Sequence, residues 1–96
     1  MTQPWRQNGV LIVDGIALRD GLYLHLSDRD YKFGTGDINV VVRGDEGVSP
    51  DEDGDWWVVL NVDQVVWDRP KRSRPLAVRA SAIRPGIRSP RQPESP

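Results

Sequence analysis

WWVVLNVDQVVWDRPKRSRPLAVRASAI, residues 56–83, is the stretch that decides the expected fold, and it holds three of the four tryptophans of the chain. Its first half alternates between two sets of side chains, and a period of two is typical of a β-strand because successive side chains point to opposite faces. The more apolar set, which we expect to face a core, comprises Trp56, Val58, Leu60 and Val62. We expect Trp57 and Val59 to face outward.

The middle of this stretch, residues 68–75, is predicted to be an irregular hairpin tip. Pro70 and Pro75 lack a backbone donor, and the cations between them repel one another. The basic tip consists of Arg69, Lys71, Arg72 and Arg74. Residues 76–83 fit a second strand or a short helix that starts after Pro75; we favour the strand, because a hairpin gives the preceding strand a partner.

The rest of the chain predicts further short strands separated by turns. Asp14-Gly15 and Asp20-Gly21 are turn dipeptides, residues 22–26 alternate cleanly, and residues 38–43 form another apolar strand. Residues 27–37 are predicted to be a loop, in which Tyr31 and Phe33 either plug the end of a barrel or wait for a ligand; we favour plugging. Residues 44–55 are predicted to be an acidic loop.

A chain of 96 residues is long enough for one domain. We expect an N-terminal arm at 1–9 with Trp5 holding it in place, a single β domain at 10–83, and a disordered tail rich in proline and arginine at 84–96. The series of short strands and turns resembles a small SH3-like or OB-like barrel. The resemblance implies an all-β fold of five or six short antiparallel strands.

The charge is unevenly distributed along the chain. Residues 1–68 carry 13 acidic and 5 basic side chains, for a net charge of −8, whereas residues 69–96 carry 8 basic and 1 acidic, for a net charge of +7. A basic C-terminal part can contact an anionic partner or the acidic part of its own chain. The acidic remainder opposes binding of a polyanion.

No pattern of residues predicts catalysis, a cofactor or a metal site. His25 is the only histidine, there is no cysteine, and no serine lies in a nucleophile-elbow motif. Asp51, Asp53 and Asp55 alternate, but Gly54 precedes the third aspartate instead of following it, so the pattern departs from that of a calcium-binding EF-hand loop. Weak calcium binding by this acidic loop is the alternative to plain solvation. We expect a protein without enzymatic activity, cofactor or metal.

The expected function is that of an interaction module that binds a protein partner. An outward aromatic sheet face, the basic tip, or both would contact the partner. The predicted face consists of Tyr23, His25, Val41, Arg43, Trp57 and Val59. A nucleic-acid-binding barrel that uses the basic tip and tail is the alternative, and an immunity-type or inhibitor-type protein is the second alternative. The sequence leaves the identity of the partner and the oligomeric state open.

No apolar run reaches the length of a membrane span, and the N-terminus lacks the pattern of a signal peptide. We therefore expect a cytoplasmic protein that does not contact a membrane.

Overall fold

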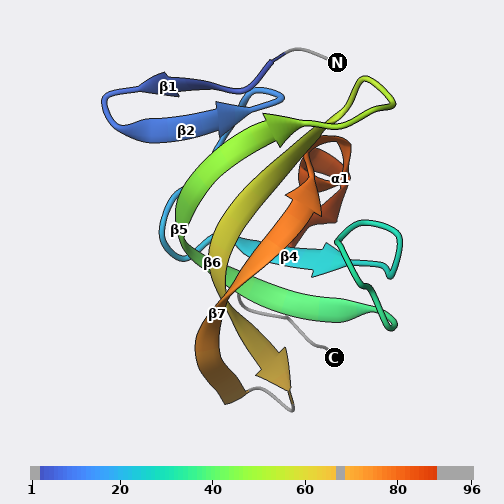
Figure 1. Ribbon diagram of the computed structural model, residues 1–96. Helices are drawn as coiled ribbons and strands as arrows, with labels where there is room; N and C mark the ends of the chain where they lie inside the picture. Colours follow the sequence, from blue (N-terminus) through green and yellow to red (C-terminus); the bar gives the residue numbers. More distant parts are fainter. Residues whose placement is uncertain (1–2, 67–68, 89–96) are drawn as a thin grey trace.

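The computed structural model describes residues 3–66 and 69–88, and for residues 69–72 it describes the backbone alone. These residues form eight strands and one helix (Figure 1). The elements are β1 (Trp5–Gln7), β2 (Val10–Val13), β3 (Ile16–Ala17), β4 (Tyr23–Leu26), β5 (Ile38–Pro50), β6 (Trp56–Val66), β7 (Arg69–Arg79), α1 (Ala80–Gly86) and β8 (Ile87–Arg88). The predicted all-β class is confirmed, with one short helix added.

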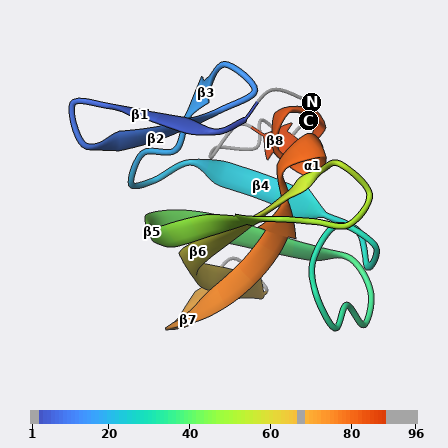
Figure 2. The ribbon, with the colours of Figure 1, turned by 45° about the horizontal axis from the view of Figure 1, so that its top comes forward.

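The strands form two antiparallel sheets instead of one. The smaller sheet has the order β1-β2-β3 and the larger has the order β7-β6-β5-β4-β8. Both views place the smaller sheet to one side of the larger one (Figures 1 and 2). The prediction of five or six short antiparallel strands is wrong in number, because the described residues form eight, and in length, because β5, β6 and β7 are each 11 residues or longer.

Two segments predicted to be loops belong to these long strands. Residues 44–50 continue β5, which shifts register against β6 between Val42 and Gly44 and again between Asp45 and Gly47. Such bulges let a strand bend while it keeps its pairing, so the acidic residues here do not interrupt the sheet. The prediction of an irregular hairpin tip at residues 68–75 is also wrong from Arg69 onward, because β7 begins there and pairs with β6 along its length. Residue 68 lies outside the described residues.

Both prolines of β7 are compatible with a strand because β7 lies at the edge of the sheet. The carbonyl of Ala77 and the N–H of Arg79 face away from β6, toward residues 30–32. The backbone N–H and C=O groups of successive residues point to opposite edges of a strand, so residues 75, 77 and 79 face the same edge. The nitrogen of Pro75 therefore faces the outer edge, and its missing donor costs no bond to β6. The rule that proline breaks strands therefore does not hold at this position.

The predicted alternation along β6 is confirmed. Val58, Leu60 and Val62 are fully buried, and Trp56 is half-buried and packs against the same core. Trp57 and Val59, on the opposite face, are both half-buried. Trp67, which follows β6, lies outside the described residues. The core also contains Leu24, Leu26, Val40, Val42, Val78 and Ile83, contributed by β4, β5, β7 and α1.

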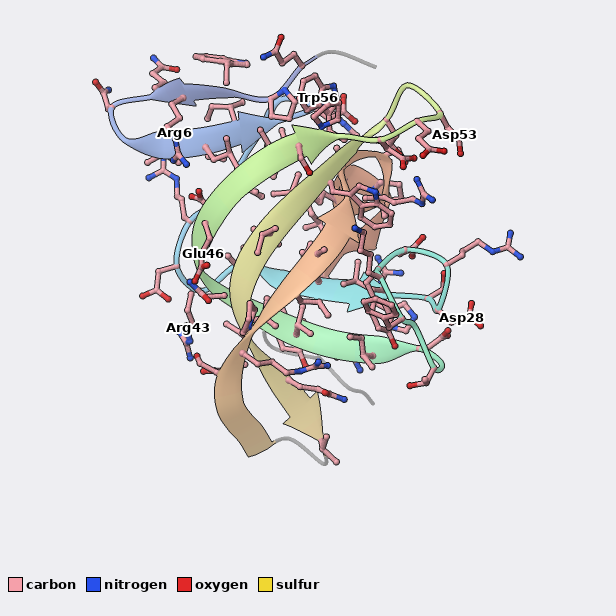
Figure 3. All side chains as sticks on the ribbon, viewed as in Figure 1. Arg6, Asp28, Arg43, Glu46, Asp53 and Trp56 are labelled. Carbon is pink, nitrogen blue, oxygen red and sulfur yellow. The ribbon has the colours of Figure 1, made fainter. Side chains whose placement is uncertain are left out.

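The N-terminal residues are part of the folded structure. Trp5–Gln7 pair with β2 across a turn at Asn8-Gly9, and β2 pairs with β3 across the predicted turn at Asp14-Gly15. Both residues of each turn have positive φ, as two-residue hairpin turns require. Arg6 reaches from β1 to Asp45 of β5, with 2.5 Å between Nη2 and Oδ1 (Figure 3). Trp5 itself remains 50% exposed.

The C-terminal boundary also differs from the prediction. β7 ends at Arg79, and Ala80–Gly86 form α1, so residues 76–83 contain a strand followed by a helix. β8 then pairs with β4, opposite Tyr23 and Leu24. The predicted disordered tail is wrong for residues 84–88, and residues 89–96 lie outside the described part of the chain. Within the described residues, no helix is long and apolar enough to cross a membrane.

Candidate functional site

The loop at residues 27–37 is fixed to the outer edge of β7. Tyr31 forms an isolated antiparallel bridge with Val78. The N–H of Lys32 donates to the carbonyl of Ala77 at 2.9 Å, and the N–H of Arg79 donates to the carbonyl of Asp30 at 2.8 Å. The loop lies beside the sheet at the end of β4, with Asp28 at its outer side (Figure 3). Its central residues are therefore held against β7 by backbone hydrogen bonds.

Two residues determine the shape of this loop. Tyr31 is buried, and its hydroxyl donates to the carbonyl of Gly36 at 2.7 Å and accepts from the N–H of Thr35 at 3.2 Å. Gly34 passes so close to Asp28 that a Cβ atom would lie 1.9 Å from the carbonyl oxygen. Any other residue would collide with that backbone, which makes glycine necessary here.

Phe33, between these two residues, points into solvent. Its side chain is 94% exposed, and its backbone has φ of +60°, a conformation that is unfavourable for a residue with a side chain. Of the aromatic pair that we expected to plug a barrel, Tyr31 is buried and Phe33 is exposed. An exposed large aromatic on a strained backbone has no role in packing.

A groove of about 400 Å³ lies between this loop and the strands β6 and β7. We call it the Phe33 groove. Its apolar lining includes Phe33, Ile38, Val59 and Pro75, and its polar lining includes Lys32, Gln64 and Arg74. None of the residues that line it carries a carboxylate, although the chain has 14 acidic residues. The groove thus combines apolar surface with positive charge.

Next to the groove, Trp57 is covered by cations. The guanidinium of Arg79 lies 4.5 Å from its ring centroid and the ammonium of Lys32 lies 5.1 Å from it. Its indole N–H donates to Asp51 at 3.1 Å, and Arg79 donates to the same carboxylate at 2.7 Å. The bond from Arg79 lowers the pKa of Asp51, and the same bond raises the pKa of Arg79. Trp57 therefore belongs to an internal stack and is not a freely exposed recognition residue.

The acidic turn after β5 is also occupied by internal contacts. Asp55 accepts from the hydroxyl of Ser81 at 2.6 Å and from the N–H of Trp56 at 2.7 Å. Asp51 is engaged as described above, while Asp53 lies at the tip of the turn (Figure 3). Among the described residues no group of three or more potential metal ligands is found. The alternating aspartates thus connect the turn to β7 and α1.

The predicted partner face is not continuous. Tyr23 lies opposite Val41, which in turn lies opposite Asp63, whereas Trp57 lies six residues further along β6. At the rise of a strand this separation is about 20 Å, on a sheet that also bends. Tyr23 and Val41 therefore lie on a different part of the surface from Trp57.

The charged and polar members of the predicted face have partners within the fold. Arg43 donates to Asp63 at 2.9 Å and to Asp20 at 3.0 Å. The bond from Ser73 and then that from Arg43 lower the pKa of Asp63. His25 Nδ1 lies 2.9 Å from Asn39 Oδ1, and its Nε2 lies 3.4 Å from Asp37. The contacts with Asp63 and Asn39 link neighbouring strands, and those with Asp20 and Asp37 connect strands to loops.

Of the predicted basic tip, the described part is Arg74, whose guanidinium donates to Gln64 at 3.2 Å in the wall of the groove. The side chains of Arg69, Lys71 and Arg72 lie outside the described part of the structure. Of the predicted site residues, Val59 and Arg74 line the groove. Phe33, which also lines it, was considered from the sequence as a residue that waits for a ligand, but plugging was favoured. The available signal was a lone phenylalanine directly before a glycine in a polar loop.

The comparisons with known proteins identify no relative. No family model matches the sequence, no curated protein matches it, and no solved structure matches the fold.

Proposed function

We propose that this protein is a non-enzymatic interaction module that binds a protein partner in the Phe33 groove. The observation that carries the proposal is Phe33, whose ring is 94% exposed on a backbone with positive φ. Strained backbone and exposed aromatic side chains are both unfavourable for the free protein, and they are concentrated at binding sites. Aromatic residues are also frequent among those that dominate binding energy.

The rigidity of the loop supports the proposal. Phe33 is flanked by Lys32, which is bonded to β7, and by Gly34, which packs against a backbone carbonyl. The backbone that carries the ring is therefore held in place beside the groove. A partner does not have to order the loop on binding, which lowers the entropic cost of association.

Recognition through side chains is favoured over addition of a strand. A peptide can extend a sheet only where the edge strand offers free donors and acceptors. The outer edge of β7 is occupied by Asp30 and Lys32 near its C-terminal end, and Pro75 lacks the donor at the next outward position. We therefore place the partner in the groove and not along the edge of β7.

This site replaces the larger sheet face that the sequence suggested. It keeps Val59 from that face and Arg74 from the basic segment, and it adds Phe33 and Lys32. We also propose that the larger sheet is a small barrel of the SH3-like type. The return of β8 to pair with β4 and the bridge between Tyr31 and Val78 support this arrangement, because they bring both edges of the sheet toward the segment around β4.

Selection of peptides from a random phage library tests the proposed function. The wild-type protein is the target, and Phe33→Gly is the counter-target, because glycine removes the ring and accepts positive φ. Trp5→Thr serves as the control, since Trp5 is also exposed but lies in the smaller sheet. We expect enriched peptides that bind the wild type and Trp5→Thr and do not bind Phe33→Gly. Enriched peptides that bind all three proteins equally would refute the groove.

A further inference from the structure

Within the described part of the chain, two cations of the Phe33 groove form no ion pair with a carboxylate. Among the described residues, Arg6, Arg43 and Arg79 each form an ion pair, whereas no ion pair includes Lys32 or Arg74. Arg74 donates to the neutral amide of Gln64, and Lys32 lies over the ring of Trp57. Both cations are therefore available to an anionic ligand.

Two carboxylates close to Lys32 along the chain, those of Asp30 and Asp37, contact other residues. Asp30 accepts from both the N–H and the hydroxyl of Ser27, at 2.8 and 3.0 Å. Asp37 lies 3.4 Å from His25. In a chain this rich in acidic residues, a groove lined with cations and without carboxylates has a charge opposite to that of its surroundings.

The apolar lining adds a second requirement for a ligand. Phe33, Ile38, Val59 and Pro75 offer apolar contact at the same groove as the two cations. Burying an apolar side chain there removes Phe33 from water, and a carboxylate beside it can pair with Lys32 or Arg74. The complementary ligand is thus an apolar side chain flanked by acidic ones.

We infer that the Phe33 groove binds an acidic segment of a protein partner, in which an apolar side chain packs against Phe33 and flanking carboxylates pair with Lys32 and Arg74. This inference rests on the proposed function and specifies the chemistry of the partner. It also implies electrostatic attraction during association, so raising the ionic strength slows binding.

A single-stranded nucleic acid is the competing anionic ligand, and the structure favours it less. Such ligands stack successive bases on several aromatic side chains. Here Phe33 is the only exposed ring at the groove within the described residues, because Tyr31 is buried and Trp57 is covered by Arg79 and Lys32.

A proton–nitrogen NMR titration of the full chain tests the inference with three probes. The first is a short peptide with a central leucine flanked by aspartates and glutamates. The second is the same peptide with lysine at every acidic position, and the third is a short oligothymidine. The variants are Lys32→Gln and Arg74→Gln, with Arg19→Gln as the control because Arg19 lines a different pocket.

We expect the acidic peptide to shift the amide signals of residues 32–35 and of Arg74, Leu76 and Ala77, and the lysine peptide not to shift them. Loss of one exposed ion pair should weaken binding about two- to fivefold for Lys32→Gln and for Arg74→Gln, and Arg19→Gln should have no effect. Equal shifts with both peptides would overturn the inference and leave the proposed function intact. Shifts with oligothymidine alone would overturn both in favour of nucleic acid. The absence of groove shifts with any probe, together with a failed phage selection, would also overturn both.

Discussion

Replacing Phe33 with glycine should stabilise the free protein slightly while it removes binding. The ring is 94% exposed, so its loss forfeits almost no buried apolar area. The backbone at φ of +60° costs a residue with a side chain about 1–2 kcal/mol, and glycine is free of this cost. Glycine also gains freedom in the unfolded chain, which subtracts about 0.5–1 kcal/mol. The balance is a free energy of unfolding that is about 0–1.5 kcal/mol higher than in the wild type.

Urea denaturation followed by tryptophan fluorescence measures this difference. Thr35→Gly is the matched control, because Thr35 is exposed in the same loop and is not among the residues with positive φ. Without strain to relieve, the control should lose about 0.5–1 kcal/mol, so the two glycine substitutions should change stability in opposite directions. An unchanged m-value would show that neither variant alters the extent of unfolding.

The reasoning is refuted if Phe33→Gly lowers the free energy of unfolding by more than 1 kcal/mol or so, the range typical of losing packed side chains. That result would mean that the ring is packed in the free protein. It would then be a structural residue, and the case for a recognition site beside it would be lost.

Three further substitutions test the loop, the core and the acidic turn. Gly34→Ala should cost about 1–3 kcal/mol in urea denaturation and reduce peptide binding, because its Cβ would lie 1.9 Å from a backbone oxygen, whereas Gly44→Ala, with open space around the new Cβ, should change little. Leu60→Ala should lower the free energy of unfolding by about 2–5 kcal/mol, because this side chain is fully buried. Asp51→Asn should flatten the acid dependence of stability, because the bond from Arg79 lowers the pKa of Asp51 in the folded protein. The stabilisation by the Asp51 carboxylate is therefore fully present above pH 3.8, the ordinary pKa of the group, and is lost as the pH falls through the lower pKa of the folded state. An identical acid profile for wild type and variant in thermal unfolding would contradict the last expectation.

Local pattern predicted the faces of the strands well. The alternation along Trp56–Val62 depends on the geometry of a strand alone, and its buried set matches the structure. The hairpin turn at Asp14-Gly15 was predictable for a similar reason, since its positive φ values match what that dipeptide tolerates. Both features are decided by residues that are close in sequence.

The wrong predictions share a cause, which is long-range pairing. The acidic and proline-containing segments were expected to be loops, but tertiary pairing extends β5 and β7 through them. The position of β7 at the sheet edge makes its prolines acceptable, and that position is not a local property. The same limit hid the candidate site, because the groove forms only where residues 27–37 meet β7.

Phe33 is the only phenylalanine of the chain, so incorporation of fluorophenylalanine gives a single fluorine NMR signal without any substitution. This signal tests the claim that the ring is open to solvent in the free protein and is covered by a partner. We predict a solvent-isotope shift close to that of the free amino acid, which decreases when a peptide from the phage selection is added. A small isotope shift in the free protein, or a signal that does not respond to a bound peptide, would contradict the account.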